Sequence, residues 1–439
     1  MDRRKFIKTS AAGAAALGIT ACGIKADKNN EAKPLGKMFC NMDGISSLGY
    51  GCMRWPTIEK EDGQKEINQE EVNKLVDRAL EAGVNYFDTA PLYVMGKSEQ
   101  ATATALLRHP RQSYFLATKC SNYRNTSYPF EAGYDMYQRS RTVFQTDYID
   151  YYLLHCITSF EDFQHRFVDN GLLEFFMKER EEGRIKHLGW SYHGDMKGFD
   201  AVLATHPQYH WDFVQIQMNY VDWRHTDGDV NAEHMYTELE KLDIPVVIME
   251  PLLGGQLSDV PSAVNDMLKE QDPSKSIASW AFRFCGTFPR ILTTLSGMTY
   301  MEHLEDNLKT FCNFEPLDEE QLQMLERAAI MIREYPTVDC TACQYCMPCP
   351  YGIDIPGVFQ FYNSQIKAGT YAVNGEQKRY EKIKRKYLLA YNKAVPTVRQ
   401  ASHCIGCRMC EHHCPQGIKI SSQMQRIDRY IENLKQDKL

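Results

Sequence analysis

The sequence predicts an α/β protein, a (β/α)₈ barrel followed by a smaller C-terminal domain of helices and loops. Between residues 40 and 333, short apolar runs alternate with amphipathic helical stretches, which is the pattern of a parallel sheet whose strands are joined by helices. Eight apolar runs of this kind occur, the number that closes such a sheet into a barrel. Beyond residue 337 the pattern stops, and eight of the fifteen cysteines crowd between Cys340 and Cys414.

The composition is that of a globular protein and argues against two classes of protein. Hydrophobic residues make up 43% and charged residues 24% of the 439 residues, as in ordinary globular domains. The formal net charge of −7 argues against a nucleic-acid-binding protein, which is typically basic. No apolar run reaches the roughly 18 residues that a membrane-spanning helix needs.

The first 22 residues are typical of an export signal. Arg3 and Arg4 form a twin-arginine pair, and a short stretch rich in alanine and glycine leads to Ile-Thr-Ala-Cys, ending at Cys22. These four residues resemble a lipobox, which would make Cys22 a lipidated membrane anchor. Residues 23–39 then read as a flexible tether. We expect export by the twin-arginine pathway, to the periplasm or as a membrane-anchored lipoprotein; a frayed N-terminal helix is the alternative.

The expected barrel strands are apolar runs bounded by turn signals or polar residues. In chain order they are residues 46–53, 84–90, 114–119, 148–155, 185–191, 213–219, 245–251 and 291–297. In a TIM barrel the C-terminal ends of the strands meet at one face, which carries the chemistry. We therefore expect the functional side chains at or just after these ends.

Helices are expected between the strands and in the C-terminal domain. The clearest covers residues 69–83, where five apolar residues share one face: Val72, Leu75, Val76, Ala79 and Leu80. Gly83 follows them, as is common after the last turn of a helix. Further helices are expected over 232–243, 317–335, 356–369 and 376–394.

Four segments of the expected barrel resemble the aldo/keto reductase family. They are EAGVNYFDTAPLYVMGKSE, YFLATK, QTDYIDYYLLH and GRIKHLGWS, and they occur in the family's order and near its spacing. Each segment alone is a weak signal, but the ordered set is specific. The resemblance covers about two thirds of the chain. It implies a TIM barrel that acts on a small carbonyl compound or alcohol.

The family's four catalytic residues fall on Asp88, Tyr93, Lys119 and His155, each at or just after an expected strand end. Hydride transfer to a carbonyl leaves an alkoxide that must be protonated, and free tyrosine, with a pKa of about 10, is a poor donor near neutral pH. A neighbouring lysine ammonium is expected to lower that pKa, and a carboxylate to orient the lysine. The imidazole can orient the carbonyl oxygen or help to move the proton. Each residue alone would also suit a purely structural role.

The resemblance also implies a nicotinamide site, with departures from the family pattern. Ser191 and Gln215 match the positions that hold the carboxamide, and Asn307 matches a position of the adenosine-phosphate loop. Tyr192 replaces the usual asparagine, and Met249 replaces the aromatic residue that stacks on the nicotinamide ring. Polar lining of the barrel is the alternative role of the serine and the glutamine.

The residues that would grip a 2′-phosphate are also changed. Gly297 and His303 stand where the family has basic residues. Without arginine or lysine there, a preference for NADPH loses its physical basis. NADH, weakened binding of NAD(P)H and no nicotinamide cofactor therefore all stay open.

Eight late cysteines form two groups with the spacing of metal ligands. The first group is Cys340, Cys343, Cys346 and Cys349, and the second is Cys404, Cys407, Cys410 and Cys414. The second group has the C-x₂-C-x₂-C-x₃-C-P spacing of bacterial ferredoxins, and the first is one residue shorter at its last step. A pair of zinc sites is the alternative. The repeated steps and the Cys-Pro ending of both groups favour iron–sulfur clusters.

Residues 337–425 resemble a two-cluster bacterial ferredoxin domain, in which the fourth cysteine of each group binds the other cluster. The resemblance implies one [4Fe–4S] cluster on Cys340, Cys343, Cys346 and Cys414. It implies a second cluster on Cys404, Cys407, Cys410 and Cys349, where the shortened step leaves the last ligand less well determined. Apart from Cys22, the other six cysteines are expected to be ordinary buried residues.

The two regions together predict an oxidoreductase of the aldo/keto reductase type, with electron transfer through two [4Fe–4S] clusters. A redox protein is the expected partner, and the basic stretch 378–386 is a candidate surface for it; a solvated helix face is the alternative. Two other functions stay open: an electron-transfer protein on a barrel that no longer turns over substrate, and a solute-binding lipoprotein. The sequence does not determine the substrate, the electron partner or the oligomeric state.

Overall fold

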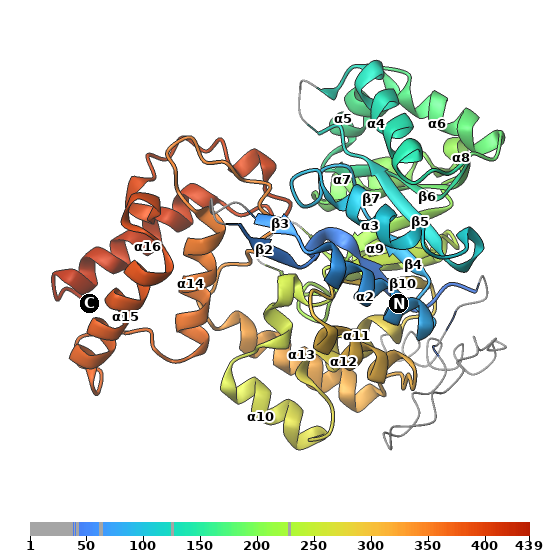
Figure 1. Ribbon diagram of the computed structural model, residues 1–439. Helices are drawn as coiled ribbons and strands as arrows, with labels where there is room; N and C mark the ends of the chain where they lie inside the picture. Colours follow the sequence, from blue (N-terminus) through green and yellow to red (C-terminus); the bar gives the residue numbers. More distant parts are fainter. Residues whose placement is uncertain (1–37, 39, 41–43, 61–64, 124–126, 227–229) are drawn as a thin grey trace. The chain divides into compact units, whose positions relative to one another are not determined.

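The computed structural model describes residues 38, 40, 44–60, 65–123, 127–226 and 230–439 (Figure 1). The expected export signal with Cys22, and all of the expected tether except Met38, lie outside the described residues. The chain divides into two compact units. We call the first the barrel unit; it contains the described residues up to Arg224, together with Val230–Pro251 and Ser279–Gln323. The second, the C-terminal unit, contains the described residues of His225–Asp229, together with Leu252–Ala278 and Met324–Leu439.

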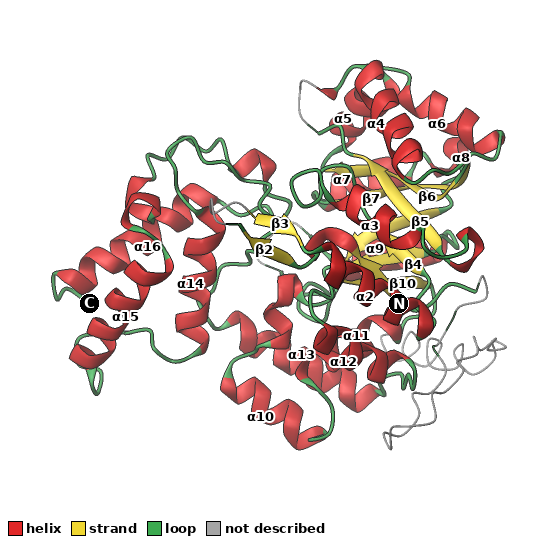
Figure 2. Ribbon diagram, in the orientation of Figure 1, coloured by secondary structure: helices red, strands yellow, loops and turns green. Residues whose placement is uncertain are grey.

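Eight parallel strands close into a barrel, which confirms the predicted fold class (Figure 2). The strands are β1 (Leu48–Gly51), β4 (Tyr86–Asp88), β5 (Phe115–Cys120), β6 (Ile149–Ile157), β7 (Ile185–Tyr192), β8 (Phe213–Gln217), β9 (Val246–Met249) and β10 (Ile291–Ser296). Each lies within or overlaps its expected run. Around the barrel, each strand pairs with its neighbours in sequence, and β1 closes the ring by pairing with both β4 and β10.

The barrel interior is filled with large apolar side chains. One cluster collects residues from seven of the strands or their approaches: Ile45, Tyr86, Ala117, Tyr151, Leu153, Phe213, Val247, Leu292 and Leu295. Each large apolar side chain that is fully buried stabilises the fold by about 1.5–3 kcal/mol. The interior is therefore a packed core, and the strand ends are left to carry the site.

Helices follow the strands as the sequence predicts. In the barrel unit they are α2 (Gln69–Glu81), α3 (Ser98–Leu106), α4 (Phe130–Val143), α5 (Phe160–Phe163), α6 (Leu172–Glu181), α7 (Met196–Leu203), α8 (His206–Tyr209), α9 (Ala232–Lys241) and α12 (Met301–Phe311). Helix α2 begins where Asn68 Oδ1 accepts a hydrogen bond from the Glu71 N–H. Its predicted apolar face is buried, except that Leu80 is half-buried.

A short antiparallel hairpin, β2 (Thr57–Glu59) and β3 (Lys65–Ile67), was not expected from the sequence. Its residues are mostly polar, and all three of β2 are exposed. A hairpin without a buried face has no alternation of apolar and polar residues, so the pattern that predicts strands is absent here.

The C-terminal unit is built around three helices, α14 (Ile355–Lys367), α15 (Tyr380–Ala394) and α16 (Ile420–Lys435). Their shared core is rich in aromatic side chains, among them Phe359, Phe361, Tyr362, Tyr387, Tyr391 and Tyr430. Asp354 begins α14 by accepting a hydrogen bond from the Gly357 N–H at 3.1 Å. Helix α15 begins four residues later than expected, because Arg379 adopts a left-handed conformation with φ of 67°.

The C-terminal unit also includes the loop after β9. This loop contains the short helical turn Leu253–Ser258 and helix α10 (Ser262–Gln271), which α11 (Ile277–Gly286) follows. Gly254 has φ of +67°, and a Cβ at this position would lie 2.4 Å from Thr341 Cα. Lys367 Nζ donates to the Gln256 carbonyl at 3.1 Å. The loop is thus packed on the segment that carries the first cysteine group, and only glycine fits at the closest approach.

Helix α13 (Glu319–Arg333) lies at the division between the units and matches the helix expected over 317–335. No helix among the described residues combines the length and the apolar character that crossing a membrane requires. The six cysteines expected to be ordinary core residues are all buried, which confirms that expectation; they are Cys40, Cys52, Cys120, Cys156, Cys285 and Cys312.

Candidate functional site

The four predicted catalytic side chains meet at one end of the barrel. Asp88 ends β4, Lys119 lies in β5, His155 lies in β6, and Tyr93 lies in the turn after β4. Lys119 Nζ donates to a carboxylate oxygen of Asp88, and to the Thr89 carbonyl at 3.1 Å. It also lies 5.4 Å from the centre of the Tyr93 ring. The rings of Tyr93 and His155 are 5.7 Å apart, edge to face.

Burial determines the charge of this group. Lys119 and Asp88 are both buried, and burial lowers the pKa of Lys119 and raises the pKa of Asp88. Their mutual attraction opposes both shifts, because it favours the ion pair. The lysine charge is therefore largely compensated by the carboxylate, and the pair presents little net charge to its neighbours.

Burial outweighs the expected lowering of the Tyr93 pKa by Lys119. Burial raises the pKa of Tyr93 well above its usual value, and the charge of Asp88 raises it further. The physical reason is that desolvation penalises the phenolate, while the lysine charge is offset by its carboxylate partner. Tyr93 is thus held as a neutral phenol, with a proton to donate.

His155 is held as a neutral imidazole. Burial lowers its pKa well below the usual value, and the charge of Lys119 adds to the effect. Its Nδ1 lies 2.6 Å from Ser121 Oγ, so one ring nitrogen is fixed by a hydroxyl. The other edge of the imidazole lies among aromatic rings, with Tyr123 at 5.6 Å and Tyr93 on the side of the site. A neutral imidazole can donate or accept one hydrogen bond at a substrate oxygen.

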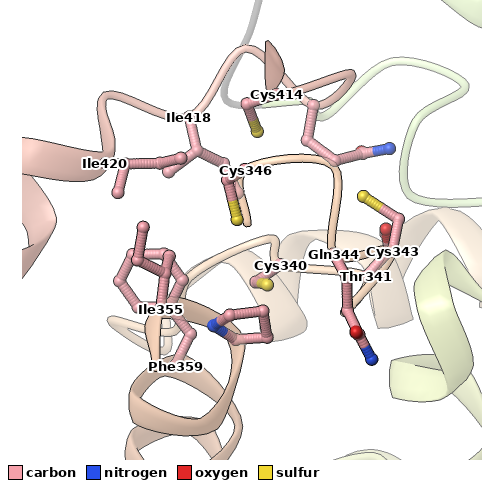
Figure 3. A pocket seen from close by; sticks show the side chains of 12 residues that line it. Cys340, Thr341, Cys343, Gln344, Cys346, Ile355, Phe359, Cys414, Ile418 and Ile420 are labelled. Atoms are coloured by element: carbon pink, nitrogen blue, oxygen red, sulfur yellow. The ribbon is translucent and has the colours of Figure 1, made fainter. Parts of the chain in front are cut away.

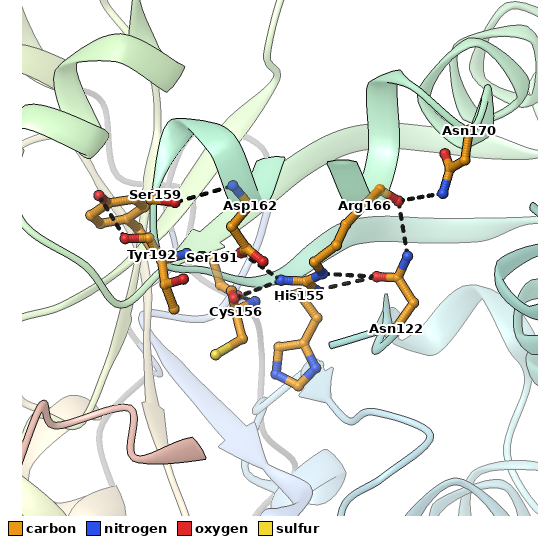
Figure 4. Close-up of polar contacts among 10 residues, drawn as sticks. Asn122, His155, Cys156, Ser159, Asp162, Arg166, Asn170, Ser191 and Tyr192 are labelled. Atoms are coloured by element: carbon orange, nitrogen blue, oxygen red, sulfur yellow. Dashed lines mark hydrogen bonds and ion pairs between the residues drawn. The ribbon is translucent and has the colours of Figure 1, made fainter. Parts of the chain in front are cut away.

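A buried arginine fixes the backbone beside this histidine (Figure 4). Arg166 lies in the turn after α5 and donates to the carbonyls of His155 and Cys156 at 2.5 and 2.9 Å. Asp162 accepts from the same guanidinium at 2.8 Å, and Asn122 Oδ1 at 3.2 and 3.3 Å. Five donors in a planar fork suit this set of acceptors.

The arginine holds a strained strand end. Cys156 has φ of 58°, which is rare for a residue with a side chain, and the pairing of β6 with β7 shifts between Leu154 and Ile157. The sequence did not single out Arg166, because it lies in the short π-helical segment Gln164–Val168, which carries no motif. Only the fold brings its guanidinium to the end of β6.

Ser191 and Gln215 lie side by side on β7 and β8, where their Cα atoms are paired. Ser191 Oγ accepts from the Cys156 N–H at 2.8 Å, so its hydroxyl hydrogen is available to another acceptor. Gln215 Nε2 contacts Met249 Sδ at 3.5 Å, and Gln215 Oε1 is buried without a hydrogen-bond partner. A carboxamide would use both groups, because its N–H donates to the glutamine oxygen and its carbonyl accepts from the serine. These residues therefore fit a nicotinamide.

The phosphate end of the predicted cofactor site differs from the expectation. Asn307 Nδ2 donates to Ser296 Oγ at 2.9 Å, so its amide is used within the barrel. Arg54, which follows β1, packs on Gly297: a Cβ there would lie 3.0 Å from Arg54 Cδ. A basic side chain thus lies beside the position where the sequence showed none. Arg54 was missed because it follows the first barrel strand and is far from Gly297 in the sequence.

Three cysteines of the first group line one cavity together with a cysteine of the second group (Figure 3). Cys340, Cys343, Cys346 and Cys414 line this hollow. Its walls are otherwise mainly apolar, with Ile355, Pro356, Phe359, Ile418 and Ile420. This is the set of four ligands that the ferredoxin resemblance implies for one cluster.

The charge of Cys349 affects the pKa values of thiols in the second group. Burial raises the pKa of Cys410 to about 11, and the charges of Glu411, Cys349 and Cys404 add to it. The pKa of Cys404 is also raised, first by burial and then by Cys349 and Cys407. The shortened step in the first group thus still leaves its last cysteine among the thiols of the second.

The two cysteine loops share one backbone conformation. In the first, Ala342 and Gln344 have φ of 54° and 67°; in the second, Gly406 and Arg408 have φ of 76° and 59°. These residues occupy the same places, two and four positions after the first cysteine of each group. The Ala342 N–H donates to Cys340 Sγ at 3.4 Å. Left-handed residues turn successive N–H groups toward one side, which stabilises sulfur that carries negative charge.

The closed parallel barrel with the Tyr-His-Lys-Asp group at its strand ends is the architecture of a TIM-barrel oxidoreductase. A sequence model of the aldo/keto reductase family matches residues 47–330, and a model of the 4Fe-4S dicluster domain matches residues 339–420. The chain belongs to the aldo/keto reductase family and carries an iron–sulfur domain after its barrel.

Curated relatives are similar to the barrel region. The uncharacterized oxidoreductase YqkF of Bacillus subtilis is 24% identical over 312 residues, which is 64% of this chain and 92% of that protein. L-galactose dehydrogenase of Arabidopsis thaliana is 24% identical over 306 residues, 65% of this chain and 91% of that protein.

Solved structures share the fold. The holo form of aldo-keto reductase AKR11C1 from Bacillus halodurans has a TM-score of 0.52 at 23% identity, over 65% of this chain and 92% of that one. An aldo/keto reductase from Klebsiella pneumoniae, in complex with NADP and acetate, has a TM-score of 0.51 at 21% identity, over 64% and 91%. At these identities the likeness concerns the fold alone.

Proposed function

We propose that this oxidoreductase interconverts a small carbonyl compound and its alcohol in the barrel, and exchanges single electrons with a redox protein through two [4Fe–4S] clusters. The observation that carries the proposal is the convergence of a neutral Tyr93, a neutral His155 and the buried Lys119–Asp88 pair at one end of the barrel. This is an arrangement for giving a proton to an oxygen atom that becomes negative.

In carbonyl reduction the chain supplies the proton and the orientation. A reduced nicotinamide, when bound, supplies the hydride to the carbonyl carbon. Tyr93 donates its phenol proton to the substrate oxygen as negative charge develops there, and the nearby Lys119 ammonium stabilises the phenolate left behind. Asp88 keeps the lysine in place, and the neutral His155 orients the substrate oxygen by a hydrogen bond.

We propose NAD(P)H as the cofactor of the barrel. Ser191 and Gln215 would hold the carboxamide, and the buried, unpartnered Gln215 Oε1 supports this assignment. Arg54 beside Gly297 restores a basic group near the predicted phosphate end, so NADPH remains as suitable as NADH. Asn307, already bonded to Ser296, is a less direct contributor than the sequence predicted.

We assign the eight late cysteines to two clusters with crossed ligation. Cys340, Cys343, Cys346 and Cys414 would hold one, supported by the cavity that they line. Cys404, Cys407, Cys410 and Cys349 would hold the other. Each [4Fe–4S] cluster, when bound, stores or releases one electron.

The location of the protein also belongs to this proposal. We propose export by the twin-arginine pathway with lipidation of Cys22, because the first 22 residues have the features of such a signal. Free nicotinamide cofactors should be scarce outside the cytoplasm. We therefore propose that the cofactor is bound before export and retained by the folded barrel.

Anaerobic purification of the full-length protein tests these proposals together. We expect about eight iron and eight sulfide per chain, and a nicotinamide dinucleotide released on acid denaturation. Dye-linked alcohol oxidation should proceed without added nicotinamide. Zinc in place of iron would contradict the cluster assignment, and strict dependence on an added nicotinamide cofactor would contradict retention. Absence of any carbonyl or alcohol turnover would leave an electron-transfer protein on an inactive barrel.

A further inference from the structure

The two predicted cluster sites differ in their access to solvent. The first lies in a hollow walled by apolar residues, of which Ile355 and Ile420 are only 2% exposed. In the second group Cys407 is exposed, the only one of the eight cysteines in that class. An electron that enters or leaves the C-terminal unit therefore has its shortest path at the second group.

Exposed apolar side chains lie in the segments around Cys407. They are Tyr351, Val398, Ile405 and Met409, with exposed fractions of 44%, 72%, 63% and 47%. Two of them, Ile405 and Met409, lie between cysteines of the second group itself. The segments are joined to one another, because the Asp354 N–H donates to the Arg399 carbonyl at 3.0 Å. Large apolar side chains gathered at one exposed place mark an interaction surface.

The same surface is basic. Lys393, Arg399, Arg408 and Lys419 are exposed between residues 391 and 420. The single acidic residue in that range is Glu411, and its carboxylate accepts from the Ser421 N–H at 2.9 Å and from the Ser421 hydroxyl at 2.5 Å. The carboxylate is thus engaged within the unit, and it is outnumbered by the four exposed basic residues, of which Arg408 and Lys419 lie close enough to lower its pKa.

We propose that this surface, which we call the second-group surface, docks a small acidic protein that carries one electron. The surface consists of Tyr351, Val398, Ile405 and Met409, flanked by Arg399 and Arg408. Tyrosine, methionine and arginine are enriched where proteins meet, and the positive rim complements an acidic partner. The inference rests on the proposed function, because it needs a cluster held by Cys349, Cys404, Cys407 and Cys410.

Only one electron passes between the carrier and the protein in each encounter. A reduced carrier loses one electron, and the group held by the second cysteines gains that electron, with no bond formed or broken and no proton moved. Reduction of one carbonyl to the alcohol requires two electrons and two protons. Two encounters with the carrier supply the electrons and solvent supplies the protons, so two encounters correspond to one turnover. In alcohol oxidation the same two encounters run in the opposite direction.

The basic stretch 378–386, the candidate from the sequence, is less suitable. Lys384 is paired with Asp437, which follows the last turn of α16. Helix α16 begins at Ile420, shortly after Cys414, and its sixteen residues span about 24 Å. The basic stretch therefore lies at the far end of this helix from the cysteines, too distant for efficient transfer of an electron.

Stopped-flow reduction of the full-length protein with both clusters tests the proposal. The probe is photochemically reduced flavodoxin, a small acidic carrier, at low and at high ionic strength. The double variant R399E/R408E should lower the second-order rate constant about 10- to 100-fold at low salt, and should weaken its dependence on salt. The matched variant K382E/R385E, which reverses two exposed charges on α15, should change it about twofold or less.

Iron content and reduction by dithionite, which needs no docking, are measured on every protein. Equal dithionite rates and full iron content show that the clusters are intact, so that a protein lacking iron would contradict the proposed function and not the surface. A larger effect of K382E/R385E, or no effect of R399E/R408E, would overturn the docking proposal. Sedimentation with phosphatidylserine vesicles that R399E/R408E abolishes, with flavodoxin rates unchanged, would assign the surface to a membrane instead.

Discussion

In the barrel, Lys119 is bonded to Asp88 and Arg166 is bonded to Asp162, so the charged groups at the site have partners within the protein. The cysteine loops of the C-terminal unit differ, because their thiols are partly buried beside one another and around a cavity. Burial and neighbouring thiols raise the pKa of Cys346. The acid–base group of the barrel is held in place by protein contacts alone, whereas the cysteine sites would be completed by the proposed clusters.

The two sites therefore differ in what offsets the free-energy cost of holding their groups together. A cysteine must lose its proton to bind a metal, and bringing several thiols together costs free energy. The free energy of metal binding offsets both costs. Backbone N–H groups reduce that cost, as at Cys414, whose pKa is raised by burial but lowered by the N–H groups of Ile418, Gln416 and Gly417. In the barrel, ion pairs within the protein offset the free-energy cost of burying the charged groups, and they need no metal.

The largest effect that tests this contrast is expected for Tyr93→Phe. Removal of the phenol proton should lower the rate of carbonyl reduction about 10²- to 10⁴-fold, because Tyr93 is the proton donor of the proposed mechanism. Cluster reduction by dithionite should be unchanged, since the cysteine loops do not depend on the barrel residues. Steady-state turnover and stopped-flow absorbance measure the two quantities.

Two further measurements qualify the Tyr93→Phe result. Iron content must equal that of the unaltered protein. If carbonyl turnover persists at more than about a tenth of the original rate, then another residue donates the proton, and the central role of Tyr93 is wrong.

A smaller effect, about 10- to 100-fold on kcat, is expected for Arg166→Lys. Lysine keeps the charge but cannot bond two carbonyls and a carboxylate at once, so the backbone at His155 and Cys156 shifts. Arg166 therefore acts as a positioning residue. Arg166→Met should in addition raise the pKa of His155, because the arginine charge lowers it after burial and Lys119. The acid limb of kcat/KM should then move to higher pH in Arg166→Met and stay in place in Arg166→Lys.

Arg111→Lys is the matched control. Arg111 donates to the carbonyls of Tyr114 and Tyr148 and to Asp150, just before β5 and β6, at the opposite end of the strands. Its replacement should cost stability but leave kcat and the pH profile unchanged. Equal losses of kcat in both variants would show that Arg166 has a purely structural role.

The smallest expected effect is a twofold loss of iron. Cys346→Ser should reduce iron from about eight to about four atoms per chain, because one of four ligands of a single cluster is lost. Cys312→Ser, which alters a buried thiol of the barrel unit, should leave the iron content unchanged. Loss of all iron in Cys346→Ser would mean that the two clusters assemble as one cooperative unit. Unchanged iron would contradict its assignment as a ligand.

The sequence was sufficient for the architecture, because strands buried on both faces leave long apolar runs and because cysteine spacing is visible directly. It was not sufficient where the fold joins distant segments. Arg166 and Arg54 come from short helical turns without a motif, and neither could be found from its neighbours in sequence. The net direction of the pKa shift at Tyr93 could not be predicted either, because it depends on how strongly burial penalises the phenolate.

The fit of Gly254 against Thr341 limits how this protein can be redesigned. The loop that leaves β9 is part of the C-terminal unit, so a cassette cut at a single point after the barrel would not carry the whole unit. Grafting the cysteine-rich segment onto another barrel would require transplanting residues 252–278 with it. The graft would first have to keep Gly254, because only glycine lets the loop approach Thr341 so closely.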